Sequence, residues 1–516
     1  ASSARPTTSR KPPAISSNRD IASARHYHER TAHSPESVRG SGHVLDWETK
    51  PRPFKIYPAL EARRLPTALP ALAMDTFAAI GPGAPPAHAA PLDLDRLAAL
   101  LFYSAGVTRV KTYPGGGQVH FRAAPSTGAL YQTEVYVVAG AVDGLAPGIY
   151  HFNPGDFSLR CLRTGDWRGA LALAAADDAV AGQPASLILS AIYWRNTWKY
   201  QARGYRHLFW DAGTMLSQVL AAARALDLPA RLLGGFVDAQ VNGLLGLDAG
   251  REGALVIAPL GADGPSAPAS PIVTPLDLEV IPLSPREVDY PLLRQAYHDS
   301  SLDSEPEVSD WREAGGQVLR SDHVVMQDLT PSRALGETIG RRGSTREFSG
   351  AAIPDTALAA ALAHATTGIP MDVPDGLVDL YVNVHAVTGL EPGSYAYDRG
   401  AHALSRLRAA DVRQASAFLC LEQALGGTSS ATVFFMGDLS RVLGGWGNRG
   451  YRLANLEAGL IGGRLYLGAY AQGFGASGLT FYDRAVVEFF SPHAVGREAL
   501  FVTALGRSRP RPATPR

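Results

Sequence analysis

In two stretches of this 516-residue chain, hydrophobic and polar positions alternate with helical and then with strand spacing, in the same order. Each stretch opens with apolar residues at helical spacing, over 93–107 and over 355–369. A mainly apolar segment follows, VYVVAGAV in the first stretch and LYVNVHAV in the second, and it predicts a strand. A Gly-Leu-x-Pro-Gly turn then leads to a short strand with aromatic residues, GIYHF or GSYAY.

The second half of each stretch repeats another pair of elements. An apolar strand is predicted at 186–193 and at 432–439, and a long helix at 205–226 and at 451–472. Helices mixed with a few strands, in this order and in duplicate, predict an α+β fold with two pseudo-symmetric halves.

The residues of the two stretches also match. EVYVVAGAVDGLAPGIY begins at Glu134 and DLYVNVHAVTGLEPGSY begins at Asp379, an offset of 245. RGYRHLFWDAGTM begins at Arg203 and RGYRLANLEAGLI begins at Arg449, an offset of 246. Because the offset changes by a single residue over about half a repeat, the sequence predicts two homologous domains.

Composition shifts mark the expected boundaries between these domains. Residues 1–25 are basic and rich in Ser and Pro, and they predict a flexible arm. The first domain, with an N-terminal extension, is expected over 26–261, and the second over 336–510. A connecting region over 262–335 begins with a stretch dense in Pro and Ser, which predicts a linker, and 511–516 form a tail.

Overall composition limits the classes of function. Apolar residues make up 46% of the chain and the formal net charge is zero, so neither nucleic acid nor a membrane surface is expected as a partner. No apolar run is long enough to span a bilayer, and no signal peptide is expected, so we expect a cytoplasmic protein. Cys161 and Cys420 lack any metal-binding context; we expect buried spectators and no metal site.

Two basic segments of the second repeat are candidates for binding an anion. RRGSTREF places Arg342, Ser344 and Arg346 at alternate positions, and alternate donors suit a phosphate group or the polar edge of a flavin. GRSRP places Arg507 and Arg509 in the same way after the last strand. Taken alone, the first segment is equally compatible with a solvated basic loop, and the second fits a basic tail better than a binding site.

A glycine-rich run of the second repeat, GFGASGL, follows the long helix. Its glycines would let the backbone approach a flat ligand closely. The first repeat has the bulkier run LDLPARLLGGF at this place. The candidate residues of this loop are Gly475, Ala476, Ser477 and Gly478.

The first repeat carries a different candidate loop. Pro125, Ser126, Thr127 and Gly128 form a short polar turn that offers backbone N–H groups and hydroxyls. The second repeat keeps only the proline, as Pro370. Alone, the turn is a common one and weak evidence for a site.

A Lys-Tyr pair, Lys199 and Tyr200, precedes the long helix of the first repeat. Such a pair can act as general base and acid if burial lowers the pKa of the lysine. The alternative is a surface lysine beside a packing tyrosine. The second repeat has Gly445 and Trp446 at the corresponding positions and could not do this chemistry.

Together these motifs resemble the flavin-dependent nitroreductase superfamily, and within it the SagB- or McbC-type azoline dehydrogenases, which include ThcOx-like enzymes. HYHERTAHSPESVR at 26–39 is similar to the segment that opens SagB-type proteins. PSTGALYQTEVYVV is similar to their following block, and YRHLFWDAG and YRLANLEAG to the helix after it. The resemblance covers residues 26–508.

The resemblance implies one FMN site shared between the two repeats. The second repeat would supply the Arg-Ser-x-Arg segment, the glycine-rich loop and the C-terminal basic pair, and the first would supply the Pro-Ser loop. The reciprocal site lacks both sets, so the resemblance implies a fused pseudo-dimer with one working site. Lys199 and Tyr200 match a catalytic pair of the azoline dehydrogenases.

The first functional hypothesis is FMN-dependent oxidation of a thiazoline or oxazoline in a ribosomally made peptide to the thiazole or oxazole. Tyr200, or Lys199 acting directly or through it, would take the proton, a hydride would pass to the flavin, and O₂ would reoxidise it. A cyclodehydratase complex is a candidate partner, and further self-association stays open. The alternatives are an NAD(P)H-dependent nitroreductase or flavin reductase, an α,β-dehydrogenase of another natural-product pathway, and a catalytically inactive scaffold.

Overall fold

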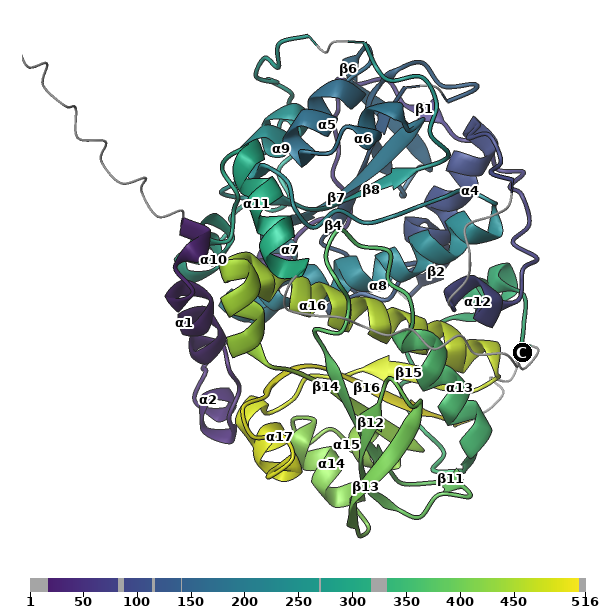
Figure 1. Cartoon of the computed structure of the whole chain (residues 1–516), viewed down its shortest axis with the longest axis vertical. Helices are drawn as coiled ribbons and strands as arrows, with labels where there is room; N and C mark the ends of the chain where they lie inside the picture. Colours follow the sequence, from purple (N-terminus) through teal and green to yellow (C-terminus); the bar gives the residue numbers. More distant parts are fainter. Residues whose placement is uncertain are drawn as a thin grey trace, which may run out of the picture.

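The computed structural model describes residues 17–81, 88–113, 117–140, 142–268, 271–316 and 332–509. Two sheets lie at opposite ends of the molecule, with two long helices between them (Figure 1). The first sixteen residues of the expected arm, residues 317–331 of the connecting region and the expected tail at 511–516 lie outside the described residues.

The two large sheets have the same topology. Both are antiparallel throughout, and five consecutive strands occur in the same order in each. The first sheet runs β1 (Arg63–Arg64), β6 (Ser158–Thr164), β5 (Gly148–Asn153), β4 (Thr133–Ala139), β7 (Ala185–Ile192) and β8 (Glu252–Leu260). The second runs β13 (Ala403–Ala409), β12 (Gly393–Asp398), β10 (Asp379–Val384), β14 (Ala431–Gly437), β16 (Glu498–Gly506) and β15 (Gly475–Gly478).

Two further strand pairs are short: β2 (Val107–Thr112) with β3 (Gln118–Arg122), and β9 (Ile353–Pro354) with β11 (Val387–Thr388). The helices up to the end of the first repeat are α1 (Ala22–Arg30), α2 (Pro35–Arg39), α3 (Thr76–Ile80), α4 (Leu94–Ala105), α5 (Arg168–Ala175), α6 (Ala179–Gly182), α7 (Tyr193–Tyr200), α8 (Gly204–Ala225) and α9 (Asp238–Leu245). Those that follow are α10 (Pro291–Asp299), α11 (Glu305–Gly316), α12 (Leu335–Arg341), α13 (Asp355–Thr366), α14 (Arg413–Leu419), α15 (Ala424–Thr428), α16 (Leu439–Ala471) and α17 (Asp483–Phe490). The predicted α+β fold of two related halves is therefore confirmed.

The long helices α8 and α16 cross between the sheets and bury nearly all of their side chains. They approach closely because glycines stand at the crossing. A Cβ atom added to Gly213 would lie 2.4 Å from the carbonyl oxygen of Leu456, and one added to Gly459 would lie 2.3 Å from that of Trp210. Gly213 and Gly459 differ by the repeat offset, so the crossing marks the pseudo-twofold axis.

Buried ion pairs join the halves symmetrically about this axis. In each half the two arginines of the RGYR motif bind one aspartate at the start of a short helix of the other half. The pairs are Arg203 and Arg206 with Asp483, and Arg449 and Arg452 with Asp238. The repeated RGYR motif thus forms ion pairs that hold the two halves together.

Part of the expected arm is more ordered than its composition suggested, and helices follow the expected linker. Residues 17–25 include a short 3-10 helix, Ser17–Arg19, and the start of α1. Asn18 is fully buried, and its side chain donates to the carbonyl of Trp446. In the connecting region α10 and α11 bury Tyr297 and Trp311 against the core. The expectation of a flexible arm was wrong over residues 17–25, because the buried side chain of Asn18 holds them against the second repeat. Helices α10 and α11 lie after the Pro- and Ser-rich stretch at 262–290, which has no helix or strand among its described residues.

Both repeats interrupt the helical backbone at equivalent positions, by ending a helix in the first repeat and by a kink in the second. In the first repeat α7 ends at Tyr200, and Gln201 takes a positive φ of 51°. In the second repeat α16 begins at Leu439, earlier than predicted, and kinks at Gly447 with φ of 63°. A positive φ suits glycine and strains glutamine, so the strained backbone of the first repeat lies directly beside the Lys-Tyr pair.

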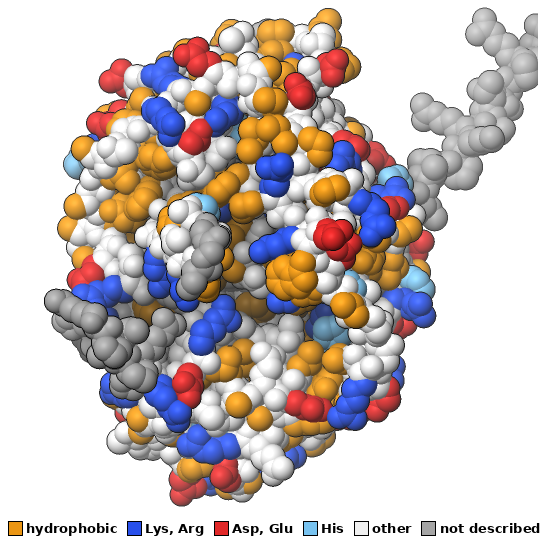
Figure 2. Space-filling view, turned by 180° about the vertical axis from the view of Figure 1, so that it is seen from behind, with side chains coloured by type: hydrophobic (Ala, Val, Ile, Leu, Met, Phe, Trp, Pro, Cys, Tyr) orange, Lys and Arg blue, Asp and Glu red, His pale blue; other side chains and the backbone are white. Residues whose placement is uncertain are grey.

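No helix in the described parts of the chain is long and apolar enough to cross a lipid bilayer. On the face shown in Figure 2, basic and acidic side chains alternate and neither charge dominates. This distribution agrees with the formal net charge of zero.

Candidate active site

A cavity of about 230 Å³ lies between the two repeats. It is lined by residues of both, which is the arrangement that the resemblance implies. The predicted site residues that line it are Pro125, Ser126, Thr127, Gly128, Lys199 and Tyr200 from the first repeat and Ser344, Arg346, Ser477 and Gly478 from the second.

Helix α7 carries Lys199 and Tyr200 at its last turn and is fixed from both sides. On one side the Arg195 guanidinium donates to the buried carboxylate of Glu134 and is itself fully buried. On the other, the Trp198 indole N–H donates to the carbonyl of Asp46 over 2.8 Å. These anchors define where the Lys-Tyr pair stands relative to the cavity.

Burial changes the proton affinity of both members of the pair. Burial, assisted by the nearby Arg346 guanidinium, lowers the pKa of the Lys199 ammonium. Burial also raises the pKa of the Tyr200 hydroxyl well above its usual value, and the Asp211 carboxylate raises it further. The lysine is therefore the better base of the two, and the tyrosine stays a neutral hydrogen-bond donor.

The polar loop of the first repeat is organised by Asp211 of α8. Its carboxylate accepts hydrogen bonds from the hydroxyls of Ser126 and Thr127, over 2.5 and 2.7 Å, and from the backbone N–H of Thr127. The side-chain amide of Gln132 donates to it over 2.7 Å. Both loop hydroxyls that the sequence offered to a ligand are thus committed to a carboxylate inside the protein.

Burial raises the pKa of Asp211 to about 6, although the hydrogen bonds from Ser126, Thr127 and Gln132 act in the opposite direction. The loop also lies against the Lys-Tyr pair: a Cβ atom added to Gly128, whose φ is +64°, would lie 2.9 Å from the Tyr200 hydroxyl oxygen. Glycine is therefore needed at 128 both for its backbone conformation and for the space that Tyr200 occupies.

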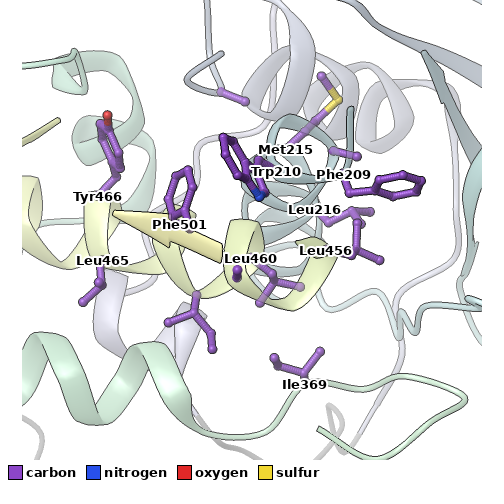
Figure 3. Close-up of a cluster of buried hydrophobic side chains, with 14 of the residues drawn as sticks. Phe209, Trp210, Met215, Leu216, Ile369, Leu456, Leu460, Leu465, Tyr466 and Phe501 are labelled. Atoms are coloured by element: carbon purple, nitrogen blue, oxygen red, sulfur yellow. The ribbon is translucent and has the colours of Figure 1, made fainter. Parts of the chain in front are cut away.

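The second repeat closes the opposite wall of the cavity. Ser344 and Arg346 follow α12, and the Ser344 hydroxyl lies 3.4 Å from that of Tyr466 on α16. The Tyr466 hydroxyl accepts the backbone N–H of Gly478. Figure 3 shows Tyr466 with Trp210 and Phe501, two further rings that line the cavity and belong to the buried core. One wall of the site is thus part of the core.

Five predicted residues do not line the cavity. Arg342 is buried and donates to the carbonyl oxygens of Arg122 and Ala123, over 2.7 and 2.8 Å, so it fastens the second repeat to the first. Gly475 and Ala476 pair with β16 outside the lining. Exposed Arg507 and Arg509 bind the carbonyl of Ala352 and the carboxylate of Glu347. The alternating spacing identified these cations but could not show which way they point.

Sequence reasoning also missed several lining residues: Trp210, Asp211, Thr214, Gln423, Tyr466, Leu479, Thr480 and Phe501. One signal was available for Asp211. It falls in the repeated motif whose second copy carries Glu457, at an offset of 246. The Glu457 carboxylate also accepts backbone N–H groups, those of Gly376 and Leu377, so an acidic residue at this position holds a loop in both repeats.

Comparison with known proteins identifies the family. The model of the nitroreductase family matches residues 88–262 and 339–493, which together make up more than half of the chain. The chain belongs to the nitroreductase family and is a nitroreductase-family oxidoreductase that contains two copies of the family's domain.

Individual relatives agree with this assignment. A putative nitroreductase of Methanocaldococcus jannaschii is 31% identical over 172 residues, which cover 33% of this chain and 81% of that protein. The microcin B17-processing protein McbC of Escherichia coli is 28% identical over 141 residues, 26% of this chain and 52% of McbC. The crystal structure of a putative nitroreductase from Anabaena variabilis superposes with a TM-score of 0.73 at 28% identity, covering 94% of this chain and 99% of that one.

Proposed function

We propose that this chain is an FMN-dependent dehydrogenase that oxidises thiazoline or oxazoline rings in a peptide to the aromatic azoles. The observation that carries the proposal is the cavity between the repeats, in which Lys199 and Tyr200 face the predicted ligand-binding residues of both halves. A nitroreductase that takes hydride from NAD(P)H has no need of a half-buried lysine of lowered pKa at this place.

The donor set of the cavity fits a flat, partly anionic cofactor. Arg346 and Lys199 are the cations among its described lining residues, and Ser344 and Ser477 add hydroxyls. Phe501 and Trp210 supply apolar ring surface, and Gly478 leaves the backbone open to close approach. Proteins of this family typically bind FMN, and we propose that these residues hold it here.

Bound FMN would supply the acceptor for the hydride that leaves the azoline ring. Neutral Lys199 would take the proton from the adjacent ring carbon, because its pKa is lowered by burial. Tyr200 would donate a hydrogen bond that orients the substrate, since its raised pKa keeps it protonated. The partial similarity to McbC supports azoline chemistry for this site; we propose O₂ as the final acceptor and a cyclodehydratase as a candidate partner.

The proposal is tested on the purified chain with a thiazoline-containing model peptide. We expect a yellow protein with one FMN per chain, and conversion of the peptide to the thiazole without added NAD(P)H, measured by a mass loss of two hydrogens. Rapid consumption of NADPH without azoline oxidation would favour the nitroreductase alternative. A colourless, inactive protein would instead favour the scaffold alternative.

Asp211→Asn should reduce the rate of azoline oxidation by about 10–100-fold, because charge-assisted hydrogen bonds of about 1.5–3 kcal/mol position the loop beside Tyr200. The variant should remain folded, and Asp211→Glu should recover part of the rate. The matched control is Glu457→Gln at the equivalent position of the second repeat, which does not line the cavity. Steady-state kinetics that find equal losses for Asp211→Asn and Glu457→Gln would contradict a positioning role for Asp211.

A further inference from the structure

The pseudo-symmetry of the molecule defines where a second, reciprocal site would lie. At the repeat offset, Trp446 corresponds to Tyr200 and Asp372 to Thr127. Gly235 corresponds to Thr480, which lines the cavity described above. The backbone supports this correspondence, since the equivalent break with positive φ follows both Tyr200 and Trp446.

The indole of Trp311, from helix α11 of the connecting region, stands among these counterparts. It is fully buried, and its N–H donates to the carbonyl of Trp446 over 3.1 Å. A Cβ atom added to Gly235 would lie 2.6 Å from the indole ring, so the ring lies directly on this backbone. The Arg449 guanidinium lies 5.9 Å from the ring centroid. A flat aromatic group therefore occupies the reciprocal position.

Asp372 and the backbone of Gly234 and Gly235, at the reciprocal position, are hydrogen-bonded within the chain. The Asp372 carboxylate accepts the backbone N–H groups of Gly234 and Gly235, over 2.7 and 3.0 Å. Arg312, the residue after Trp311, donates to Asp372 over 2.9 Å and to the carbonyl of Gly235 over 2.8 Å. At the reciprocal position the Trp311 indole thus supplies the flat ring, and Arg312 supplies hydrogen-bond donors to Asp372 and to the backbone. A bound heteroaromatic ligand would make contacts of the same kinds.

We propose that α11 is a built-in plug that fills the second ring-binding site of the pseudo-dimer, with the Trp311 indole in the place of a planar heteroaromatic ligand. This inference rests on the proposed function only in taking the first cavity as a ring-binding site. A filled second position would explain why a chain with two homologous domains binds one cofactor and not two. It also defines a cryptic site for flat tricyclic rings that removal of the indole should open.

The test uses the full-length protein, purified with its cofactor, and the double variant Trp311→Gly/Arg312→Ala. The probe is lumichrome, a tricyclic flavin ring without a phosphate, because the reciprocal position has no counterpart of the basic Arg346 segment. We expect the variant to bind one equivalent of lumichrome beyond the cofactor content of the wild-type protein, and the wild-type protein to bind none. Isothermal titration calorimetry measures the stoichiometry, and thermal melting confirms folding.

The matched control is Trp167→Ala. Trp167 is also a buried tryptophan whose indole N–H donates to a backbone carbonyl, that of Thr164, but it does not line the first cavity and is not one of the residues named at the reciprocal position. A folded double variant that binds no lumichrome, or a Trp167→Ala variant that binds it equally well, would overturn the proposal. If the double variant does not fold, Trp311→Ala is measured with the same outcomes.

The two proposals fail separately. Absence of a cofactor and of azoline oxidation in the wild-type protein contradicts the proposed function, whereas the plug is tested by the difference in lumichrome binding between variant and wild type. Loss of the first site's cofactor or rate in a folded Trp311 variant would also overturn the plug, because that result would make Trp311 a support of the first site.

Discussion

Lys199→Ala should lower the rate of azoline oxidation by about 10²–10⁴-fold, the usual contribution of a positioned general base. The loss should appear in kcat, because the lysine acts on the reacting proton. In the unaltered enzyme kcat should rise with pH and level off around the pKa of Lys199, which burial places below that of an ordinary lysine. Stopped-flow or steady-state kinetics over a pH series measure both effects.

The control for this variant is Lys50→Ala. Lys50 is an exposed lysine that packs over Trp47, outside the residues that line the cavity. It should keep the parent rate. The visible flavin spectrum of Lys199→Ala should survive, since Arg346 remains to support the cofactor. An unchanged rate in Lys199→Ala would show that the pair is structural and would bring the NAD(P)H-dependent alternative forward.

Periodicity predicted the fold well because the strands and helices of the core repeat a strong local signal. Strands such as β4 and β10 are buried along almost their whole length, so they read as apolar runs in both copies. The N-terminal arm was misjudged for the opposite reason. One buried residue, Asn18, holds residues 17–25 against the second repeat, and a basic composition rich in Ser and Pro hides that contact.

The candidate site could be predicted only to the level of its segments. Asymmetric retention of motifs indicated which half supplies which wall, and the cavity brings most of those residues together. Orientation is a tertiary property, however. Arg342 and Arg346 are four residues apart in one motif, yet Arg342 binds backbone carbonyls of the other repeat while Arg346 lines the cavity. Asp211 was missed because its partners lie about eighty residues away along the chain.

The arginine pairs illustrate what a repeat can and cannot reveal. Two copies of RGYR were visible in the sequence, but nothing local shows that each pair meets an aspartate of the other half. That exchange is what makes the two domains interdependent. A chain built in this way is expected to fold as one unit, because each half separately would lose the counter-charge of its two interface arginines and expose the surface that buries them.

Asp483→Asn should therefore lower the free energy of unfolding by about 3–5 kcal/mol, the cost of removing one partner from a buried charge cluster. The Asp483 carboxylate pairs with Arg203 and Arg206 over 2.9 and 2.6 Å, and all three side chains are nearly inaccessible to solvent. Asparagine keeps the shape but not the charge. Asp238→Asn should cost a similar amount, because Asp238 holds the symmetric pair. Urea unfolding followed by circular dichroism measures both.

The control for this prediction is Asp289→Asn. Asp289 also uses both carboxylate oxygens, which contact one arginine, Arg294, over 2.7 and 2.8 Å, but about half of each side chain is exposed. An exposed pair is worth about 0–1 kcal/mol, so this variant should unfold almost like the parent. If Asp483→Asn proved as stable as Asp289→Asn, the buried arginine–aspartate pairs between the repeats could not be what couples the two halves. The glycine crossing of α8 and α16 would then have to hold the two domains together without them.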